Sequence, residues 1–317
     1  MNVLSLFDGM SCGQIALNRV GIKYDNYFAS EIDKHAIQVT QKNYPNTIQL
    51  GSVTEVDGKS LPKIDLLIGG SPCTNFSFAG KRMGMVTKDN VEILTLEHYL
   101  ELKNEGFKFE GQSYLFWEYV RILKETNPKY FLLENVKMSS KWKDLITKIL
   151  GVEPIYINSE VISAASRPRL YWTNIPNVKQ PKEKNILFKD IIDTDNSNYY
   201  YWKDFQMEKY FNKQYVRRDY YRIEEPNSKV QCLLAQFGQN HPKCWSDKEN
   251  LFRKLTPLEF ERCQTVPDNY TKVDGISDNQ RYKMLGNGWT VDVIAHIFKN
   301  IKEVDNLKSI KYNNQSK

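Results

Sequence analysis

The sequence predicts an α/β fold: a mostly parallel β-sheet with helices on both faces, together with a smaller second domain. Two observations support this prediction. Between residues 3 and 173, short apolar runs alternate with segments of helical periodicity, which is typical of sheets built from successive β–α units. Near residue 176 the periodicity weakens, and residues 177–255 are rich in Asn, Lys and Tyr.

The strands are predicted from short runs of β-branched and large apolar residues. In chain order they are residues 3–7, 27–32, 64–68, 130–133, 155–161 and 169–173. Polar residues stand at the ends of several runs, so side chains capable of chemistry are expected to collect at strand ends.

Helices are predicted between these strands. The first covers residues 12–20 and stops at Gly21, and the second starts near Asp33. A third covers residues 115–123, where apolar side chains recur at the spacing of one helix face. Residues 142–150 complete this set.

Helical signals return after the Asn- and Tyr-rich region. Thr256 is a good cap and the proline after it opens a helix. A last helix is predicted over residues 291–301, with apolar positions suited to packing on the first domain. The expected domains are residues 1–180 and 275–317 for a discontinuous large domain, and residues 181–274 for a small one.

Residues 84–112 do not fit the β–α alternation. They include a helix-like piece at residues 91–103. The segment is either a lid or extra binding surface, or a simple surface insertion, and the insertion is the favoured interpretation.

Composition limits the class of protein. The 317 residues are 41% hydrophobic and 26% charged, as in globular proteins. The net charge of +6 permits a polyanionic partner without proving one. No apolar run approaches the ~20 residues that cross a bilayer. The first ten residues carry Asp8 and no basic leader, so we expect no signal peptide.

The cysteines argue against disulfide bonds and metal. Five cysteines lie scattered at positions 12, 73, 232, 244 and 263 without a C-x-x-C pair. An odd, scattered set predicts neither a disulfide framework nor a zinc site, and we expect no metal. A reducing cytoplasm is the simplest location, where Cys73 is available as a thiol.

The segment FDGMSCG, residues 7–13, joins the first predicted strand to the first helix. An acid and glycines at such a junction let the backbone approach a ligand at the carboxyl end of the strand; a plain tight turn is the alternative. The spacing is not GxGxxG, so a nicotinamide dinucleotide is not favoured. Glu31 closes the second strand, either as a ligand for both hydroxyls of a ribose or as a solvated loop acid.

Cys73 follows a predicted strand in the sequence GGSPC. Most cysteines are small buried hydrophobes. A turn after a strand, however, is a place for groups that face a cleft, and a cysteine thiolate is a strong nucleophile.

Three charged residues also fall next to strands. Glu134 lies at the end of one, and Arg167 and Arg169 lie at the start of another. A capping acid and surface arginines are the simple alternatives. Arg169 reaches the ligand edge only if its strand runs antiparallel to the others. With Cys73 these residues form a plausible set of nucleophile, acid and oxyanion partner.

Seven segments in this order resemble the C5-cytosine DNA methyltransferases. They are FDGMSCG, ASEID, GGSPC, LLENV, SRPRLYW, RKLTPLEFERCQTVPDNY and MLGNGWTVDVI. The resemblance covers nearly the whole chain and is thin over residues 84–112 and 177–250. The wording is closest to the animal de novo branch and its bacterial and phage relatives. It implies the Rossmann-like fold of class I S-adenosylmethionine-dependent methyltransferases, with a small target-recognition domain.

The resemblance implies a role for each matching residue. Cys73 attacks C6 of a cytosine flipped out of double-stranded DNA. Glu134 binds the N3/N4 edge and helps to protonate N3, and Arg169, with Arg167 nearby, orders the base at O2. The residues implied around S-adenosylmethionine, which leaves as S-adenosylhomocysteine, are Phe7, Asp8, Gly9, Glu31, Ile32, Ser52, Pro72, Asn287, Trp289 and Val291. Pro72 also holds Cys73.

Ser52 departs from the family pattern. The family has an acid here that contacts the adenine amino group, and this sequence reads Leu50-Gly51-Ser52-Val53. A serine accepts a hydrogen bond more weakly than a carboxylate does, so cofactor affinity is expected to be lower unless a backbone group compensates.

DNA contacts are expected from two segments. Asn75, Ser77, Lys81 and Arg82 follow Cys73 in a loop that closes over the base. Residues 197–222 hold six basic and three acidic residues, a net charge of +3, with seven tyrosines and one tryptophan. Such a mixture suits phosphate contact and packing around a displaced base; a solvated Tyr-rich surface is the alternative. Arg217 and Arg218 are candidates for reading guanine.

Two other functions compete with DNA methylation. One is an RNA cytosine C5-methyltransferase on the same scaffold. The other is a catalytically silent DNA-binding paralogue, which would be expected to lack Cys73, Glu134 or Arg169; all three are present. We expect an enzyme that acts as a monomer in the cytoplasm of a bacterial cell or a phage-infected host.

Overall fold

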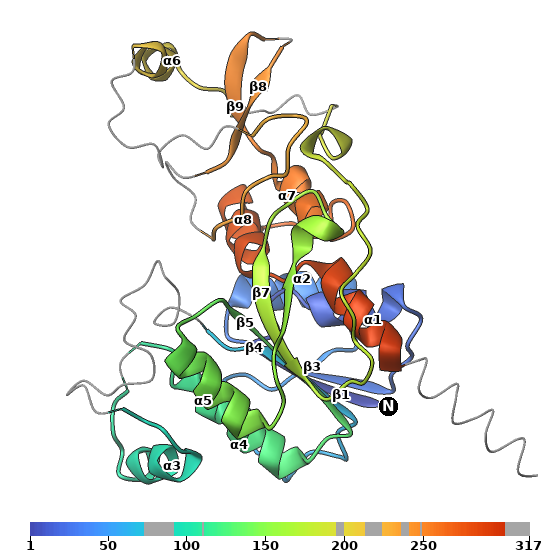
Figure 1. The fold of residues 1–317 in the computed structure, drawn as a ribbon, viewed down its shortest axis with the longest axis vertical. Helices are drawn as coiled ribbons and strands as arrows, with labels where there is room; N and C mark the ends of the chain where they lie inside the picture. The colour runs from blue at the N-terminus through green and yellow to red at the C-terminus, as the bar shows by residue number, and fades with distance from the viewer. Residues whose placement is uncertain are drawn as a thin grey trace, which may run out of the picture. The chain divides into compact units, whose positions relative to one another are not determined.

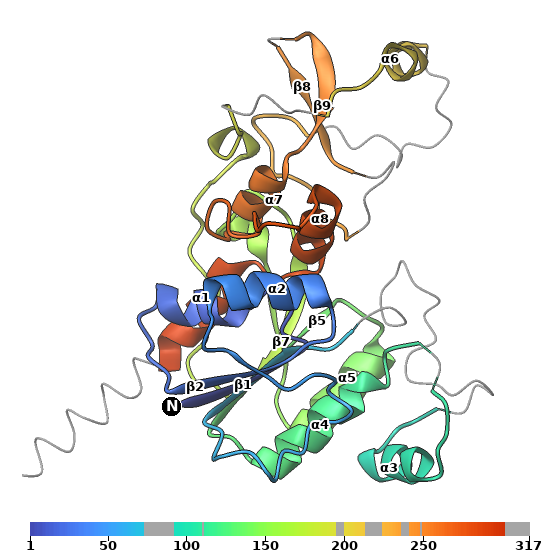
Figure 2. The same ribbon diagram turned by 180° about the vertical axis from the view of Figure 1, so that it is seen from behind.

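The protein is described by a computed structural model that covers residues 1–72, 92–109, 111–194, 200–212, 224–235, 241–247 and 249–301. These residues form two compact units. The described residues of the first unit fall within Met1–Ile157, Pro168–Val178 and Ile297–Lys317, and those of the second within Asn158–Arg167 and Lys179–His296. Figures 1 and 2 show both units from opposite sides.

A seven-stranded sheet is the centre of the first unit (Figure 1). In spatial order its strands are β3 (Ile48–Gln49), β2 (Asn26–Ser30), β1 (Asn2–Leu6), β4 (Leu66–Gly70), β5 (Tyr130–Val136), β7 (Pro168–Thr173) and β6 (Ile155–Asn158). The pairs from β3 to β5 are parallel, and β7 runs antiparallel to β5. The predicted mostly parallel sheet is therefore confirmed.

Helices cover both faces of this sheet, as predicted. The helices of the first unit are α1 (Cys12–Arg19), α2 (Lys34–Asn43), α3 (Leu96–Asn104), α4 (Leu115–Thr126) and α5 (Ser140–Leu150). In both views α1 and α2 lie on one face and α4 and α5 on the other (Figures 1 and 2). The predicted start of α2 is confirmed, because the Asp33 side chain accepts a hydrogen bond from the His35 N–H and so caps the helix.

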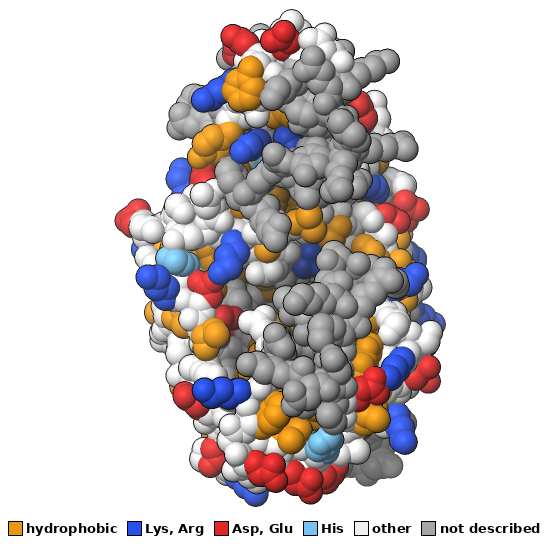
Figure 3. Space-filling view, turned by 90° about the vertical axis from the view of Figure 1, so that its left-hand side faces the viewer, with side chains coloured by type: hydrophobic (Ala, Val, Ile, Leu, Met, Phe, Trp, Pro, Cys, Tyr) orange, Lys and Arg blue, Asp and Glu red, His pale blue; other side chains and the backbone are white. Residues whose placement is uncertain are grey.

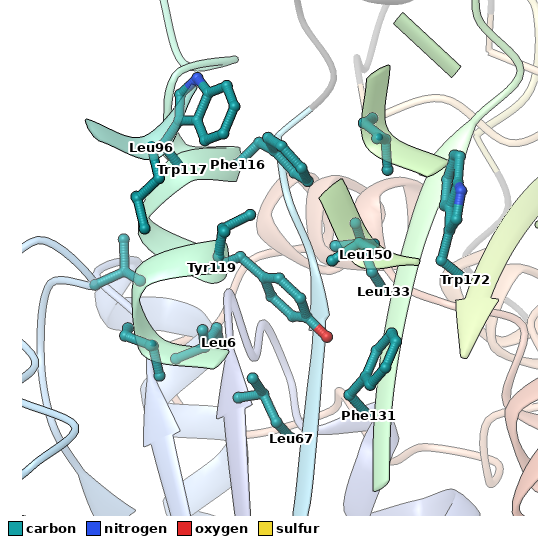
Figure 4. Close-up of a cluster of buried hydrophobic side chains, with 14 of the residues drawn as sticks. Leu6, Leu67, Leu96, Phe116, Trp117, Tyr119, Phe131, Leu133, Leu150 and Trp172 are labelled. Atoms are coloured by element: carbon teal, nitrogen blue, oxygen red, sulfur yellow. The ribbon is translucent and has the colours of Figure 1, made fainter. Parts of the chain in front are cut away.

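The apolar core beneath α4 and α5 follows from the alternation of side chains along each strand. Leu4, Leu6 and Leu67 point to this face and pack with Tyr119 of α4 and Phe131 of β5. Figure 4 shows the Tyr119 ring lying over the strands between Leu6, Leu67 and Phe131. Helix α4 contributes buried side chains to this cluster from the face that the spacing of residues 115–123 predicts.

The second unit is built from short elements. They are the 3₁₀ turns η1 (Ser159–Val161) and η2 (Phe188–Asp190), the helices α6 (Asp204–Phe211), α7 (Pro257–Cys263) and α8 (Asp278–Asn287), and the hairpin of β8 (Lys243–Ser246) and β9 (Leu251–Lys254). The predicted Thr256 cap is confirmed: its hydroxyl accepts from the Glu259 N–H, and the Glu259 carboxylate accepts from the Thr256 N–H. The last predicted helix is confirmed over residues 291–301 and starts at Val291 as predicted, while its end falls beyond the described residues.

The main differences from prediction lie at strand ends. The strand expected over residues 155–161 ends at Asn158, because the Asn158 side chain accepts from the Glu160 N–H and turns the chain into η1. Conversely, β5 runs three residues past the predicted Leu133, since its residues from Glu134 to Val136 pair with β7. The assignment of residues 181–274 to target recognition stays a prediction, because a compact unit by itself does not identify a substrate. Among the described residues, no helix is both long and apolar enough to cross a membrane.

A buried hydroxyl gives a stability prediction. Within the described part of the chain, the Tyr119 hydroxyl is buried and has no hydrogen-bond partner. Tyr119→Phe removes this unsatisfied group and keeps the ring, so we expect the free energy of unfolding to rise by about 1 kcal/mol. Denaturant titration measures the change.

Tyr99→Phe is the matched control. The Tyr99 hydroxyl donates to the buried Glu118 carboxylate at 2.5 Å, so its removal is expected to lower the free energy of unfolding. Equal effects of the two substitutions would contradict the distinction between them.

Candidate active site

The strand order reverses beside β1, and this reversal defines the candidate site. The chain adds β2 and β3 on one side of β1 and then β4 and β5 on the other. In open α/β sheets, ligands bind at the carboxyl ends of the strands at such a switch point. Phe7, Asp8 and Gly9 follow β1, and Ser71 and Pro72 follow β4, so both predicted segments leave the sheet at this point.

The loop after β1 has an unusual backbone. Phe7, Gly9 and Ser11 have φ angles of 58°, 59° and 65°, in the left-handed region that non-glycine residues rarely adopt. The loop is held by hydrogen bonds from the Asp8 N–H to the Ser30 carbonyl and from the Gly9 N–H to a Glu31 carboxylate oxygen. Strain of this kind concentrates at functional sites, which favours the ligand loop over the plain turn.

Glu31 organises the end of β2. One of its oxygens accepts from Gly9 at 2.8 Å, and the other accepts from the N–H groups of Ile32 and Asp33 at 2.7 and 2.8 Å. A carboxylate has about four acceptor positions, so Glu31 retains capacity for a ligand hydroxyl. The next side chain, Ile32, is 73% exposed, an apolar surface directly beside this acid.

Asp8 is a buried acid in the same loop. Its Oδ1 accepts from the Tyr27 hydroxyl at 2.8 Å, while its Oδ2 is buried without a hydrogen-bond partner among the described residues. Burial raises the pKa of Asp8 to about 6, although hydrogen bonds from Ser5, Tyr27 and Ser11 act in the opposite direction. A buried acid with one unsatisfied oxygen can accept a hydrogen bond from a ligand donor.

Ser52 lies in the loop after β3. Its hydroxyl is 2.7 Å from the Thr54 hydroxyl and accepts from the Thr54 N–H at 3.3 Å. The neighbouring Gly51 has a φ of 74°, and its carbonyl accepts from the Ser30 hydroxyl. Ser30 thereby ties this loop to the end of β2, next to Glu31.

Glu134 and Arg169 form an ion pair. The Arg169 Nε donates to Glu134 Oε1 at 2.7 Å, and both side chains are about nine-tenths buried. The antiparallel register pairs Glu134 with Tyr171 and Val136 with Arg169. Since β7 runs antiparallel, Arg169 lies at the carboxyl end of β5, and the condition set by the sequence is met.

The turn before Cys73 is held from β5. The Asn135 side-chain amide donates to the Ser71 hydroxyl at 3.0 Å and to the Ser71 carbonyl at 3.3 Å. Neither Asn135 nor Ser71 was predicted from the sequence as a site residue. The available signal was that Asn135 directly follows Glu134 in the sequence. Pro72 is partly buried. Cys73 itself lies outside the described residues, as do Asn75, Ser77, Lys81 and Arg82.

Arg167 belongs to the second unit and has different neighbours from Arg169. Its guanidinium is buried and donates to the carbonyls of Leu233, Gly286 and Asn287 at 3.1 to 3.4 Å. It therefore joins two backbone segments of the second unit.

The segment NGW is positioned within the same unit. Asn287 is exposed and Trp289 is partly buried. Val291 is fully buried, and its N–H donates to the Gln264 carbonyl. The Gln264 amide donates to the carbonyls of Leu285 and Gly288, so Gln264 also braces this turn.

Two further predictions concern basic residues that contact DNA and the absence of a metal site. On the face shown in Figure 3, described Lys and Arg side chains are interspersed with Asp and Glu rather than gathered in one patch. Arg217 and Arg218 lie outside the described residues. In the described ranges, no group of three or more His, Cys, Asp or Glu residues could hold a metal ion.

Comparison with known proteins gives one family. The family described as C-5 cytosine-specific DNA methylase matches residues 1–150 and 162–303. The type II methyltransferase M1.ScrFI of Lactococcus lactis subsp. cremoris is 28% identical over 95% of this chain and 78% of its own length. The type II methyltransferase M.FnuDI of Fusobacterium nucleatum is 29% identical over 96% of this chain and 94% of its own length.

Two solved structures support the fold. The Entamoeba histolytica methyltransferase EhMeth has a TM-score of 0.70 at 17% identity, with coverage of 96% of this chain and 98% of that chain. The Dnmt2 methyltransferase of S. pombe has a TM-score of 0.69 at 18% identity, with coverage of 96% and 99%.

The buried carboxyl of Asp8 gives a pH prediction. Its pKa of about 6 exceeds the ordinary value of 3.8, so the stability that Asp8 contributes is present at low pH and lost as the pH rises through about 6. We expect the free energy of unfolding to fall by roughly 1 kcal/mol in wild type relative to Asp8→Asn between about pH 5 and about pH 7.5. Denaturant titrations of both proteins measure it. A difference that does not vary with pH, or varies in the opposite direction, would contradict the raised pKa.

Proposed function

The chain belongs to the C-5 cytosine-specific DNA methylase family, and on this basis we propose how its residues transfer a methyl group to C5 of cytosine in DNA. The family and its full-length bacterial relatives identify an enzyme, a DNA cytosine C5-methyltransferase. The observation that carries the proposed mechanism is the buried Glu134–Arg169 ion pair at the carboxyl edge of the sheet.

The residues after β1 and β2 fit S-adenosylmethionine. The unsatisfied Asp8 Oδ2 suits a ligand donor, and Glu31 has acceptor capacity for ribose hydroxyls. Ile32 offers exposed apolar surface to a base. At Gly9 a Cβ atom would meet nothing within 4 Å, so the backbone there is open to a ligand. When bound, this cofactor supplies an electrophilic methyl group.

We assign the cofactor residues on this fit and on the family resemblance. Phe7, Asp8 and Gly9 would hold the cofactor from the loop after β1, with Glu31 and Ile32 beside them. Ser52 and Pro72 would complete this set from the first unit. Roles for Asn287, Trp289 and Val291 of the second unit rest on the resemblance alone.

The cytosine chemistry is assigned to three residues. The Cys73 thiolate adds to C6 of the base, and the electron pair of the C5–C6 double bond moves toward N3. Glu134 must be protonated for this step: it gives its proton to N3 and becomes the carboxylate that pairs with Arg169, which leaves a neutral enamine with a nucleophilic C5. After C5 is methylated, solvent takes the C5 proton, the C5–C6 double bond is restored as the C6–S bond breaks to release the Cys73 thiolate, and the N3 proton returns to Glu134.

The two arginines have separate roles in this proposal. Arg169 is bonded to Glu134 and is buried with it, so it fixes the orientation of the acid and can donate to the O2 of the base. Arg167 donates to backbone carbonyls of the second unit, so we assign it a positioning role there, in place of the contact with the base that the sequence suggested.

A DNA substrate follows from the family, and for duplex DNA the addition to C6 requires base flipping. Stacked neighbours cover both faces of a cytosine inside a duplex, so a thiolate cannot add to C6 there, and we propose that the base is flipped out. The DNA-contact roles of Asn75, Ser77, Lys81 and Arg82, and of Arg217 and Arg218, remain proposals. So do action as a monomer and a cytoplasmic location.

The first prediction concerns Cys73. Cys73→Ala is expected to abolish methyl transfer and to leave S-adenosylhomocysteine binding nearly unchanged, because only the nucleophile is lost. Bisulfite sequencing of unmethylated duplex DNA incubated with S-adenosylmethionine reads the activity and its sequence context together. Retained methylation by the variant would rule out Cys73 as nucleophile, and methylation of transfer RNA but not DNA would favour the RNA alternative.

The second prediction concerns Ser52. Its hydroxyl pairs with Thr54, so Ser52→Asp replaces a weak, already engaged acceptor with a charged one. We expect the dissociation constant of S-adenosylhomocysteine to fall roughly fivefold, as for one added hydrogen bond of about 1 kcal/mol. Calorimetry measures it. An unchanged constant would mean that another group already binds the adenine amino group.

A further inference from the structure

The loop after β3 is held in place by two cations. This loop, residues 51–56 and called the β3 loop below, starts at the Gly51-Ser52 turn. The Lys103 ammonium donates to the Thr54 carbonyl at 3.2 Å. The Arg121 guanidinium donates to the Val53 and Val56 carbonyls at 3.2 and 2.9 Å. Three carbonyls of the β3 loop, those of Val53, Thr54 and Val56, are therefore bonded to positively charged side chains.

One buried carboxylate anchors both cations. Glu118 of α4 has no exposed surface. Its Oε1 accepts from Lys103 and from the Tyr99 hydroxyl, and its Oε2 accepts from Arg121 at 2.8 Å. A buried carboxylate is stable only when its oxygens are satisfied, so the network has one favourable arrangement.

Arg121 is fixed a second time. Its guanidinium also donates to both oxygens of Glu125 at 2.8 Å, and Glu125 accepts from the Gly58 N–H at 2.9 Å. The chain just beyond the β3 loop is thus held by the same helix α4. A linked network of this kind loses more than one bond when a member is removed.

Lys103 is the member that comes from outside the β–α core. It lies on α3, within residues 84–112, for which the sequence left a lid, a binding surface and a simple insertion open. The ring of Tyr99, in the same helix, contacts those of Phe109 and Tyr114 at ring-centroid distances of 5.0 and 6.2 Å. Helix α3 is joined to α4 by the bonds of Tyr99 and Lys103 to Glu118.

We propose that Lys103 is a positioning residue for the cofactor: through its bond to Thr54 it holds the β3 loop, and hence Ser52, in the geometry that binds the nucleoside. The inference rests on the proposed function, in which Ser52 contacts the cofactor. It gives the segment that interrupts the β–α pattern a task in cofactor binding. Lys103 touches neither the cofactor nor the base in this proposal and acts only through the β3 loop.

Lys103→Met tests the proposal. The substitution keeps the apolar stem and removes the ammonium, while Glu118 remains paired with Arg121 and Tyr99. We expect the dissociation constant of S-adenosylhomocysteine, measured by calorimetry, to rise roughly fivefold, as for the loss of one hydrogen bond. The KM for S-adenosylmethionine should rise by a similar factor, with kcat changed by less than about twofold, and Lys103→Arg should restore most of the affinity.

Lys124→Met is the matched control. Lys124 also joins α4 to α3, by an exposed ion pair with Glu97 at 3.5 Å, and within the described part of the chain it has no hydrogen bond or ion pair with the β3 loop. Lys124→Met should leave the dissociation constant of S-adenosylhomocysteine unchanged. Equal constants for wild type and Lys103→Met, or equal losses in both lysine variants, would overturn the inference.

Hydrogen exchange provides a second test if Lys103→Met folds poorly. Hydrogen exchange of the folded fraction should be faster in peptides from residues 51–58 of Lys103→Met than of wild type, and exchange at wild-type rates would overturn the proposal. The proposed function fails separately: wild type that does not bind S-adenosylhomocysteine would overturn the cofactor site and this inference with it, whereas binding by wild type with an unaffected Lys103→Met overturns the inference alone.

Discussion

The parallel alignment of five strands is the constraint on which the site depends. Because β3, β2, β1, β4 and β5 run in one direction, the loops that follow them leave the sheet at one edge. Segments separated by more than a hundred residues in the chain thus contribute to one site. The single reversed strand, β7, adds a residue from its start, and this is how Arg169 comes to lie beside Glu134.

Several glutamate side chains of this protein are buried, which is unfavourable for a charged group, and each is stabilised by pairing with an arginine. Glu134, Glu118, Glu259 and Glu261 are each less than a tenth exposed, and each has an arginine partner. Removing one member of such a pair leaves an uncompensated buried charge, which costs more than the pair itself contributes. Asp8 differs: burial raises its pKa to about 6, although hydrogen bonds from hydroxyl groups act in the opposite direction. The candidate site therefore combines one buried ion pair, Glu134–Arg169, with one buried acid, Asp8, whose pKa is raised to about 6.

The sequence predicted the fold because strand periodicity and helix caps are local signals. Three predicted features depend only on neighbouring residues and are confirmed: the Thr256 cap, the Asp33 start of α2 and the start of the last helix at Val291. Strand ends were less predictable, because β5 extends to Val136 only through pairing with β7, a segment more than thirty residues away. The contacts of Asn135 with Ser71, and of Lys103 with Thr54, are of the same nonlocal kind. The spacing of residues along the chain does not predict these contacts.

Arg167 and Arg169 show why residue type alone does not assign a role. They are two positions apart, and the family resemblance places both near the base, with Arg169 as the residue that orders it. Arg169 lies beside the Glu134 carboxylate, so its charge is paired with the acid to which the proposed proton transfer is assigned. Arg167 donates to three carbonyls and to the Cys232 thiol, and these neutral acceptors fix the geometry of its guanidinium. A guanidinium surrounded by carbonyls joins backbone segments, whereas one paired with an acid orients that acid. The neighbours of each side chain, which only the fold supplies, therefore decide between structure and catalysis.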